Sequence, residues 1–162
     1  MPKSENGFTE RRNKIVMFAY ILDMDGVIIH SNPLHAEVWR LYLSRYEVPA
    51  DSMMERMHGK RNDQIVRALF GPHLTEQEVF AHGAAKEALY RELMRPQLAG
   101  HLVAGLVPFL ERHATRPLAV ASNAERANLD FVLDEGGLRR FFPVAGSNCT
   151  ANGVHVAGST SL

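Results

Sequence analysis

Two carboxylates stand at the end of an apolar run near the start of the chain. Asp23 and Asp25 follow the segment Lys14–Leu22 and precede Gly26. Residues two apart in an extended segment point to the same side, so the two side chains should share a face. Like charges this close need a cation or a shared proton, and Mg²⁺ favours oxygen ligands. The spacing predicts a magnesium site; the alternative is a simple turn, where aspartate and glycine are common.

The apolar run before the aspartates has the length and composition of a buried strand. Lys14–Leu22 is apolar almost throughout, which favours a strand of a parallel sheet covered on both faces. Ligands of open α/β sheets bind beyond the carboxyl ends of the strands. Asp23 and Asp25 should lie at that end, where Gly26 lets the chain turn away without blocking the site.

The segment from residue 31 to about residue 100 carries helical patterns and no strand pattern. Thr75 and Glu78 form a capping box, which marks the start of a long helix. Further helices are indicated by an N-cap followed by proline and by glycine stop signals. One helix is expected to begin at Asn32-Pro33. Three more should cover Asp51–Met57, Asn62–Phe70 and Thr75 to about Arg95.

Strand patterns return after this helical block. The expected elements are a helix at Val107–His113, a strand at Pro117–Ala121, a helix at Ala124–Glu135 and a third strand at Phe142–Ala145. The order strand, helical block, helix, strand, helix, strand predicts an α/β fold, a Rossmann-like parallel sheet with an all-helical insertion after its first strand. The chain then divides into a polar tail (1–13), a discontinuous core (14–30 and 101–145), the helical insertion (31–100) and an irregular tail (146–162).

The composition argues against several classes of function. Lys plus Arg and Asp plus Glu each number 18, so the net charge is +0, and we expect no nucleic-acid partner and no membrane partner. The apolar run Ile15–Leu22 is too short to cross a bilayer. The single cysteine, Cys149, cannot form an internal disulfide, which fits a cytoplasmic protein.

The segment DMDGVIIHSNPLHAEVW, residues 23–39, resembles the first motif of the haloacid dehalogenase superfamily. It is most similar to the β-phosphoglucomutase-like branch, whose members carry a helical cap directly after this motif, where the helical block of this chain lies. Pro117–Asn123 resembles the second motif, a strand that ends in serine or threonine. The resemblance covers Ile15 to Phe142 and implies a capped α/β core, incomplete at its C-terminal side.

The resemblance implies roles for the residues of both motifs. Asp23 would be the nucleophile that forms an aspartyl-phosphate, and Asp25 the general acid and base. Both would bind Mg²⁺, Asp23 through its carboxylate and Asp25 through its backbone carbonyl. Ser122 and the backbone N–H of Asn123 would bind the phosphate; the alternative for Ser122 is a plain N-cap.

Four residues match positions that the branch uses around its cap. His35 would orient or relay a proton near Asp25, or is a hydrogen-bonded surface histidine. Trp39 lies on the same helical face, where it contacts substrate or, as the favoured alternative, packs the cap. Lys60 and Arg61 stand in a loop before a helix, where they select an anionic substrate or form a solvated charge pair.

The third and fourth motifs of the superfamily, which supply a lysine and the acids that complete the Mg²⁺ site, have no match here. The last lysine is Lys86, and no Lys, Asp or Glu occurs from Gly136 to Leu162. We therefore expect a chain that is truncated at its C-terminus or has a replaced tail, and weak metal binding. Ile15–Leu22 would then be an apolar edge strand open to self-association.

The resemblance implies a Mg²⁺-dependent phosphatase or hydrolase that acts on a small phosphorylated metabolite. The presence of Asp25 favours phosphate esters, because phosphonate-cleaving relatives carry a small residue there. Two alternatives remain at this point: a β-phosphoglucomutase-type sugar-phosphate mutase, and a non-catalytic chain that binds only phosphate ligands or a partner chain.

Overall fold

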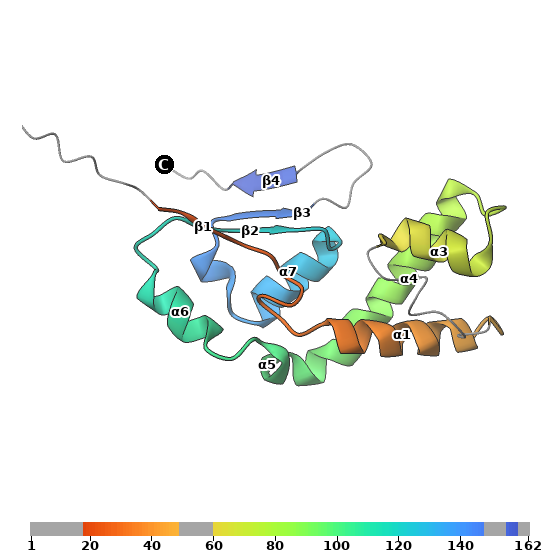
Figure 1. The fold of residues 1–162 in the computed structure, drawn as a ribbon, viewed down its shortest axis with the longest axis horizontal. Coiled ribbons are helices and arrows are strands. Elements are labelled where there is room, and N and C mark those ends of the chain that lie inside the picture. Colours follow the sequence, from red (N-terminus) through yellow and green to blue (C-terminus); the bar gives the residue numbers. More distant parts are fainter. Residues whose placement is uncertain (1–17, 49–59, 148–154, 159–162) are drawn as a thin grey trace, which may run out of the picture.

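The structure is a computed structural model that describes residues 18–48 and 60–147, together with the backbone of 155–158. Its sheet contains four strands in the order β1-β2-β3-β4. The strands are β1 (Tyr20–Leu22), β2 (Leu118–Ser122), β3 (Val144–Ser147) and β4 (His155–Gly158). β1, β2 and β3 are parallel and β4 pairs antiparallel with β3 (Figure 1). The predicted Rossmann-like parallel sheet is confirmed, and β1 lies at one end of the order, as expected for an edge strand. Among the described residues the strand covers only Tyr20–Leu22 of the predicted Lys14–Leu22, and the exposed Ile21 corrects the prediction that both faces are covered.

The C-terminal part of the sheet corrects the predicted irregular tail. The third strand occupies Val144–Ser147 rather than Phe142–Ala145, and β4 lies inside the segment expected to be irregular. The Gly-, Ser- and Asn-rich sequence after residue 145 carries little strand propensity. Pairing with a neighbouring strand, which sequence propensity does not report, decides the structure here. Ala145 pairs with Ala157, and Gly146 with Val156.

One face of the sheet is covered by two helices, α6 (Leu106–Arg112) and α7 (Arg126–Glu135), which lie below the sheet in Figure 1. The ring of Tyr20 in β1 meets that of Phe109 in α6 at 5.4 Å. The other face carries Ile21, Ala119 and Val144, which pair in register across three strands. Ile21 is 72% exposed and Val144 38% exposed.

The helical block forms the cap, which lies at the right of the sheet in Figure 1. Its described helices are α1 (Asn32–Ser44), α3 (Asn62–Phe70) and α4 (Glu76–Met94), followed by the short η1 (Arg95–Gln97) and α5 (Leu98–His101). The predicted bounds of α3 are confirmed, as is the capping box of Thr75 and Glu78 at the start of α4. The helix expected at Asp51–Met57 falls outside the described residues.

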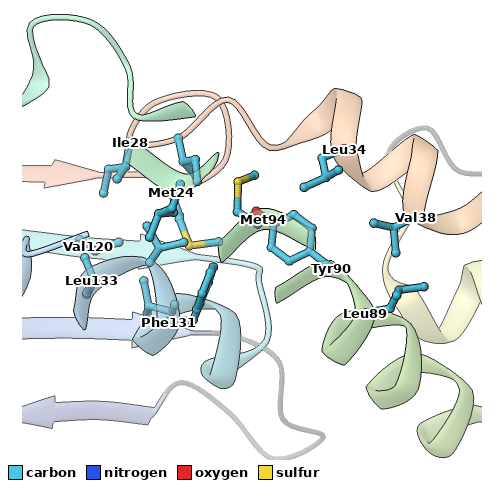
Figure 2. Close-up of a cluster of buried hydrophobic side chains, with 14 of the residues drawn as sticks. Met24, Ile28, Leu34, Val38, Leu89, Tyr90, Met94, Val120, Phe131 and Leu133 are labelled. Carbon is cyan, nitrogen blue, oxygen red and sulfur yellow. The ribbon is translucent and has the colours of Figure 1, made fainter. Parts of the chain in front are cut away.

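A single apolar cluster joins the cap to the sheet. Val120 of β2 and Leu133 of α7 lie near Met24, and Tyr90 and Met94 of α4 continue the cluster toward Leu34 and Val38 of α1; Figure 2 shows these side chains together. The shared core fixes the position of α4 relative to the carboxyl ends of β1 and β2. No helix in the described part of the chain is long and apolar enough to span a membrane.

Candidate active site at the cap–core junction

The loop after β1 turns both aspartates away from the core. Met24, which lies between them, is fully buried, whereas Asp23 is exposed and Asp25 is half-buried. The backbone carbonyl of Met24 accepts hydrogen bonds from the N–H groups of Ile28 and Ile29 at 2.9 and 3.1 Å. Gly26 has a φ of 81°, which glycine adopts without a steric penalty. The tight loop therefore buries Met24 between an exposed carboxylate, Asp23, and a half-buried one, Asp25.

Asp25 is held by a buried serine at the start of α1. Ser31 Oγ donates to Asp25 Oδ1 at 2.5 Å. Burial raises the pKa of Asp25, the nearby charges of Asp23 and Glu87 raise it further, and the bond from Ser31 opposes them. A carboxyl with a raised pKa is suited to giving and taking a proton.

The same serine corrects the predicted start of α1. Ser31, not Asn32, is the N-cap residue, and its side chain makes no capping bond. Serine is an ordinary N-cap residue, but here its hydroxyl bonds the Asp25 carboxylate instead. The predicted helix start is therefore correct within one residue. The hydrogen bond from Ser31 to Asp25 was not predicted.

His35 lies on α1 against the cap helix α4. Its Nδ1 accepts a hydrogen bond from Lys86 Nζ at 2.8 Å, and its ring stacks on that of Tyr90 at 4.0 Å. Burial, followed by the charge of Lys86, lowers the pKa of His35 to about 4. The ring is therefore neutral at pH 7, as an acceptor for an ammonium group must be.

Lys86 is a buried cation of the cap, and no role was predicted for it from the sequence. It is 1% exposed, pairs with Glu87 Oε1 at 2.8 Å and lies 5.2 Å from the centre of the Trp39 ring. Burial lowers the pKa of Lys86, and the charges of Glu87, Glu125 and Asp25 oppose this effect. Trp39, itself 1% exposed, forms part of the packing around Lys86, which fits the favoured packing role.

Glu87 connects the cap helices to the core. Its Oε1 accepts from Asn62 Nδ2 of α3 and its Oε2 from Asn128 Nδ2 of α7, both at 2.6 Å. Arg91 Nη1 in turn donates to Asn128 Oδ1 at 2.7 Å. Burial alone would raise the pKa of Glu87, but the charge of Lys86 and the hydrogen bonds hold it at about 2. Glu87 is therefore an ionised carboxylate with partners on three helices.

The predicted phosphate loop lies at the end of β2, beside the end of β1. Leu22 pairs with Val120, so Asp23 and Ser122 lie at the same edge of the sheet. Ser122 is buried and its Oγ accepts from the Ala124 N–H at 3.1 Å, which leaves its own proton for a ligand oxygen. Asn123 is exposed. α7 begins at Arg126, two residues later than predicted, because Glu125 is its N-cap residue.

Lys60 and Arg61 lie at the start of α3. Both are exposed, and Arg61, the N-cap residue of that helix, pairs with Asp63 at 3.0 Å. The structure thus places the two cations beside Asn62 at the cap end of the junction, and their predicted role toward an anionic substrate stays a prediction.

The donor set at the aspartate loop fits a hard cation with few protein ligands. Asp23 offers an exposed carboxylate and Asp25 a backbone carbonyl at the same strand end. Mg²⁺ commonly takes one or two carboxylates and completes its shell with water and phosphate. Within residues 18–48 and 60–147, no group of three or more His, Cys, Asp or Glu side chains could hold a metal ion.

The sequence carried a signal for the residues that were missed. Lys86 and Glu87 fall on the buried stripe of α4, at helical spacing from Val79 and Tyr90. Charged residues on an apolar stripe are rarely buried unless paired, so their position indicated a paired group. Their partners could not be identified, because Asn62 and Asn128 are 25 and 41 residues from Glu87 in sequence.

A parallel sheet, a helical cap after its first strand and a carboxylate pair at their junction define a capped α/β fold with a candidate acidic site. The haloacid dehalogenase-like hydrolase family matches residues 18–156, and the chain belongs to this family. The resemblance seen in the two sequence motifs is thereby confirmed.

Individual relatives agree with this assignment. The fructose-1-phosphate phosphatase YqaB of Escherichia coli (strain K12) is 30% identical over 125 residues, which cover 75% of this chain and 64% of that protein. A family IA, variant 3 HAD hydrolase from Entamoeba histolytica HM-1:IMSS superposes with a TM-score of 0.69 at 21% identity, over 78% of this chain and 58% of the other.

The β-phosphoglucomutase of Clostridium difficile shares the fold with a TM-score of 0.67 at 18% identity, over 84% of this chain and 64% of that one. The fold of the β-phosphoglucomutase-like branch is thereby confirmed. The chain spans 58–64% of the length of these three proteins.

Proposed function

We propose that this chain is a phosphatase that hydrolyses a small phosphorylated metabolite through an aspartyl-phosphate intermediate, with Mg²⁺ as cofactor. The observation that carries the proposal is the pair of Asp23 and Asp25, one exposed and one held by Ser31 with a raised pKa. Two carboxylates in different environments suit two different tasks, nucleophile and acid–base. Membership of a hydrolase family and the activity named for YqaB support the same reaction class.

In the first step a carboxylate oxygen of Asp23 attacks phosphorus, and the bond from phosphorus to the ester oxygen breaks. Asp25, protonated, gives its proton to the departing oxygen, so that an alcohol leaves. In the second step water attacks the aspartyl-phosphate, Asp25 takes a proton from it, and the bond to Asp23 breaks to release phosphate.

The remaining residues bind and orient. The Ser122 hydroxyl and the Asn123 backbone N–H would hold the phosphoryl oxygens. Ser31 holds the Asp25 carboxyl. Mg²⁺, held by the Asp23 carboxylate and the Asp25 carbonyl, would reduce the charge repulsion between carboxylate and phosphate. A sugar monophosphate is the substrate class that the name of YqaB supports.

A second candidate is a chain that binds phosphate ligands without hydrolysing them. It is favoured by the absence of Lys, Asp and Glu from residues 136–162 of the sequence, because such residues would neutralise phosphate and complete the metal site. Lys86 does not take this place in the described structure, since it already bonds Glu87 and His35.

The test is hydrolysis of an aryl phosphate with and without Mg²⁺ by the wild type and by D23N and D25N. We expect Mg²⁺-dependent turnover in the wild type, a loss of at least about 10³-fold in D23N and of about 10²–10⁴-fold in D25N. Equal and negligible rates in all three proteins, with phosphate still bound, would favour the second candidate.

A further inference from the structure

Glu125 lies where three helices meet at the junction of cap and core. It stands three residues after Ser122 and is the N-cap residue of α7. Its Oε1 accepts from Asn62 Nδ2 of α3 at 3.3 Å. A Cβ placed on Gly83 of α4 would lie 3.9 Å from Glu125 Oε1 and 3.8 Å from Asn62 Cβ. The carboxylate therefore bonds α3 and lies beside Gly83 of α4, three residues after Ser122 of the predicted phosphate loop.

The carboxylate of Glu125 has acceptor capacity beyond its hydrogen bond from Asn62. Asn62 Nδ2 divides its donation between Glu87 at 2.6 Å and Glu125 at 3.3 Å, and the second bond is beyond the usual length for N–H···O. A carboxylate has about four acceptor sites. Glu125 is half-buried, so an additional donor that shortens or replaces this bond would be favourable. A ligand hydroxyl is such a donor, and it can also accept from the Asn62 amide.

The charge around Glu125 disfavours a second anion. Burial and then the charge of Glu87 raise the pKa of Glu125, while the Asn62 bond and the charges of Arg91 and Lys86 oppose this effect. Arg91 donates to Asn128, so neither cation is bonded to Glu125 itself. Lys86, the buried cation nearby, is bonded to Glu87 at 2.8 Å. A second phosphate at this position would bring further negative charge against two carboxylates, and such a contact costs more in a partly buried site than in water.

We propose that Glu125 and Asn62 determine specificity by binding a hydroxyl group of the substrate and rejecting a second phosphate. The substrate class is then the monophosphate ester of a neutral polyol or sugar, with the phosphate at Ser122 and a hydroxyl at Glu125. This inference rests on the proposed function, because it requires the phosphate to lie at the aspartate loop.

The cations at the start of α3 provide the opposing hypothesis. Lys60 and Arg61 lie next to Asn62 and could receive a second phosphate. Arg61, however, already pairs with Asp63. The two hypotheses differ in which variant changes the affinity for a bisphosphate, E125Q or R61Q.

The test is calorimetric binding in the presence of Mg²⁺, in the D23N background so that no ligand is consumed. The probes are fructose 1-phosphate, fructose 1,6-bisphosphate and inorganic phosphate. The carboxylate at position 125 should favour the monophosphate. E125Q should raise affinity for the bisphosphate about tenfold and weaken the monophosphate about threefold, and E125K should reverse the preference. Circular dichroism and the thermal midpoint verify folding, and E111Q on α6 serves as the matched control, with no change in either affinity.

Each outcome decides between the proposals. An unchanged ratio of the two affinities in E125Q and E125K, or bisphosphate binding that falls in R61Q, would overturn the specificity proposal and leave the proposed function standing. Failure of all three probes to bind D23N, together with failure of inorganic phosphate to bind the wild type with Mg²⁺, would overturn both. A changed ratio in E125Q together with the D23N-sensitive hydrolysis described above would support both.

Discussion

The two ends of β1 lie in contrasting environments. Beyond its carboxyl end, the junction buries charge: Lys86 and Glu87 are 1% and 3% exposed, and each has hydrogen-bonded partners. Along the strand and before it, apolar side chains face solvent: Phe18 is 61% and Ile21 72% exposed. The described residues therefore bury and pair the charges at the junction but leave an apolar face of β1 exposed.

Substitutions in the two regions should change the free energy of unfolding by different amounts. A buried charge that loses one partner keeps its full desolvation penalty, so single changes at the junction should be costly. An exposed apolar side chain loses little when it is replaced. We therefore expect substitutions at the junction to change stability, and substitutions at the β1 edge to change any association with other chains.

The largest effect should come from Glu87. E87A removes the partner of Lys86, Asn62 and Asn128 at once, and we expect the free energy of unfolding to fall by about 3–5 kcal/mol. Urea denaturation measures the change. E92A, on an exposed position of the same helix, should stay within about 0.5 kcal/mol of wild type; similar losses in both variants would contradict the contrast.

The next effect is a pH dependence that originates at His35. Its pKa is about 4 in the folded protein because of burial and Lys86, against about 6.5 in an unfolded chain. Between these values the unfolded state binds more protons, so stability is lost as the pH falls from about 6.5 to 4, by up to about 3 kcal/mol. Glu87 acts in the same direction at lower pH, below its ordinary range, whereas the raised pKa of Asp25 acts in the opposite direction.

The difference between wild type and H35N isolates this contribution. Denaturation across pH 4–7 should show a smaller slope in H35N, and H73N, at an exposed histidine before α4, should keep the wild-type slope. A slope that H35N leaves unchanged would show that His35 is not the group that titrates.

The sequence predicted local features well and long-range contacts poorly. Asp23, Asp25 and the bounds of α3 follow from signals within a few residues, namely a strand end, a glycine and stop residues. The Glu87 network joins residues tens of positions apart, and β4 forms only through pairing with β3. Neither the partners of Glu87 nor the pairing of β4 leaves a periodic pattern in the sequence. The polar composition after residue 145 therefore suggested an irregular tail in place of a strand.

Tyr90 tests whether every buried polar group at the junction has a hydrogen-bond partner. Among the described residues, its Oη is the buried side-chain polar atom without a hydrogen-bond partner, although the ring stacks on His35. Y90F keeps the ring and removes the unpaired hydroxyl, so we expect the free energy of unfolding to rise by up to about 1 kcal/mol. A loss of 1 kcal/mol or more in thermal and urea denaturation would mean that this hydroxyl has a partner in solution.

The smallest effect on stability, and the sharpest test of the β1 edge, concerns Ile21. I21T leaves strand propensity intact and removes apolar surface that is 72% exposed, so we expect a change in the free energy of unfolding within about 0.5 kcal/mol. Self-association should nevertheless fall, since an apolar edge strand is a template for pairing with another chain. Sedimentation at several concentrations measures it, and L41T, at an exposed leucine of the cap, is the matched control. Equal self-association in wild type, I21T and L41T would show that the β1 edge does not cause the self-association.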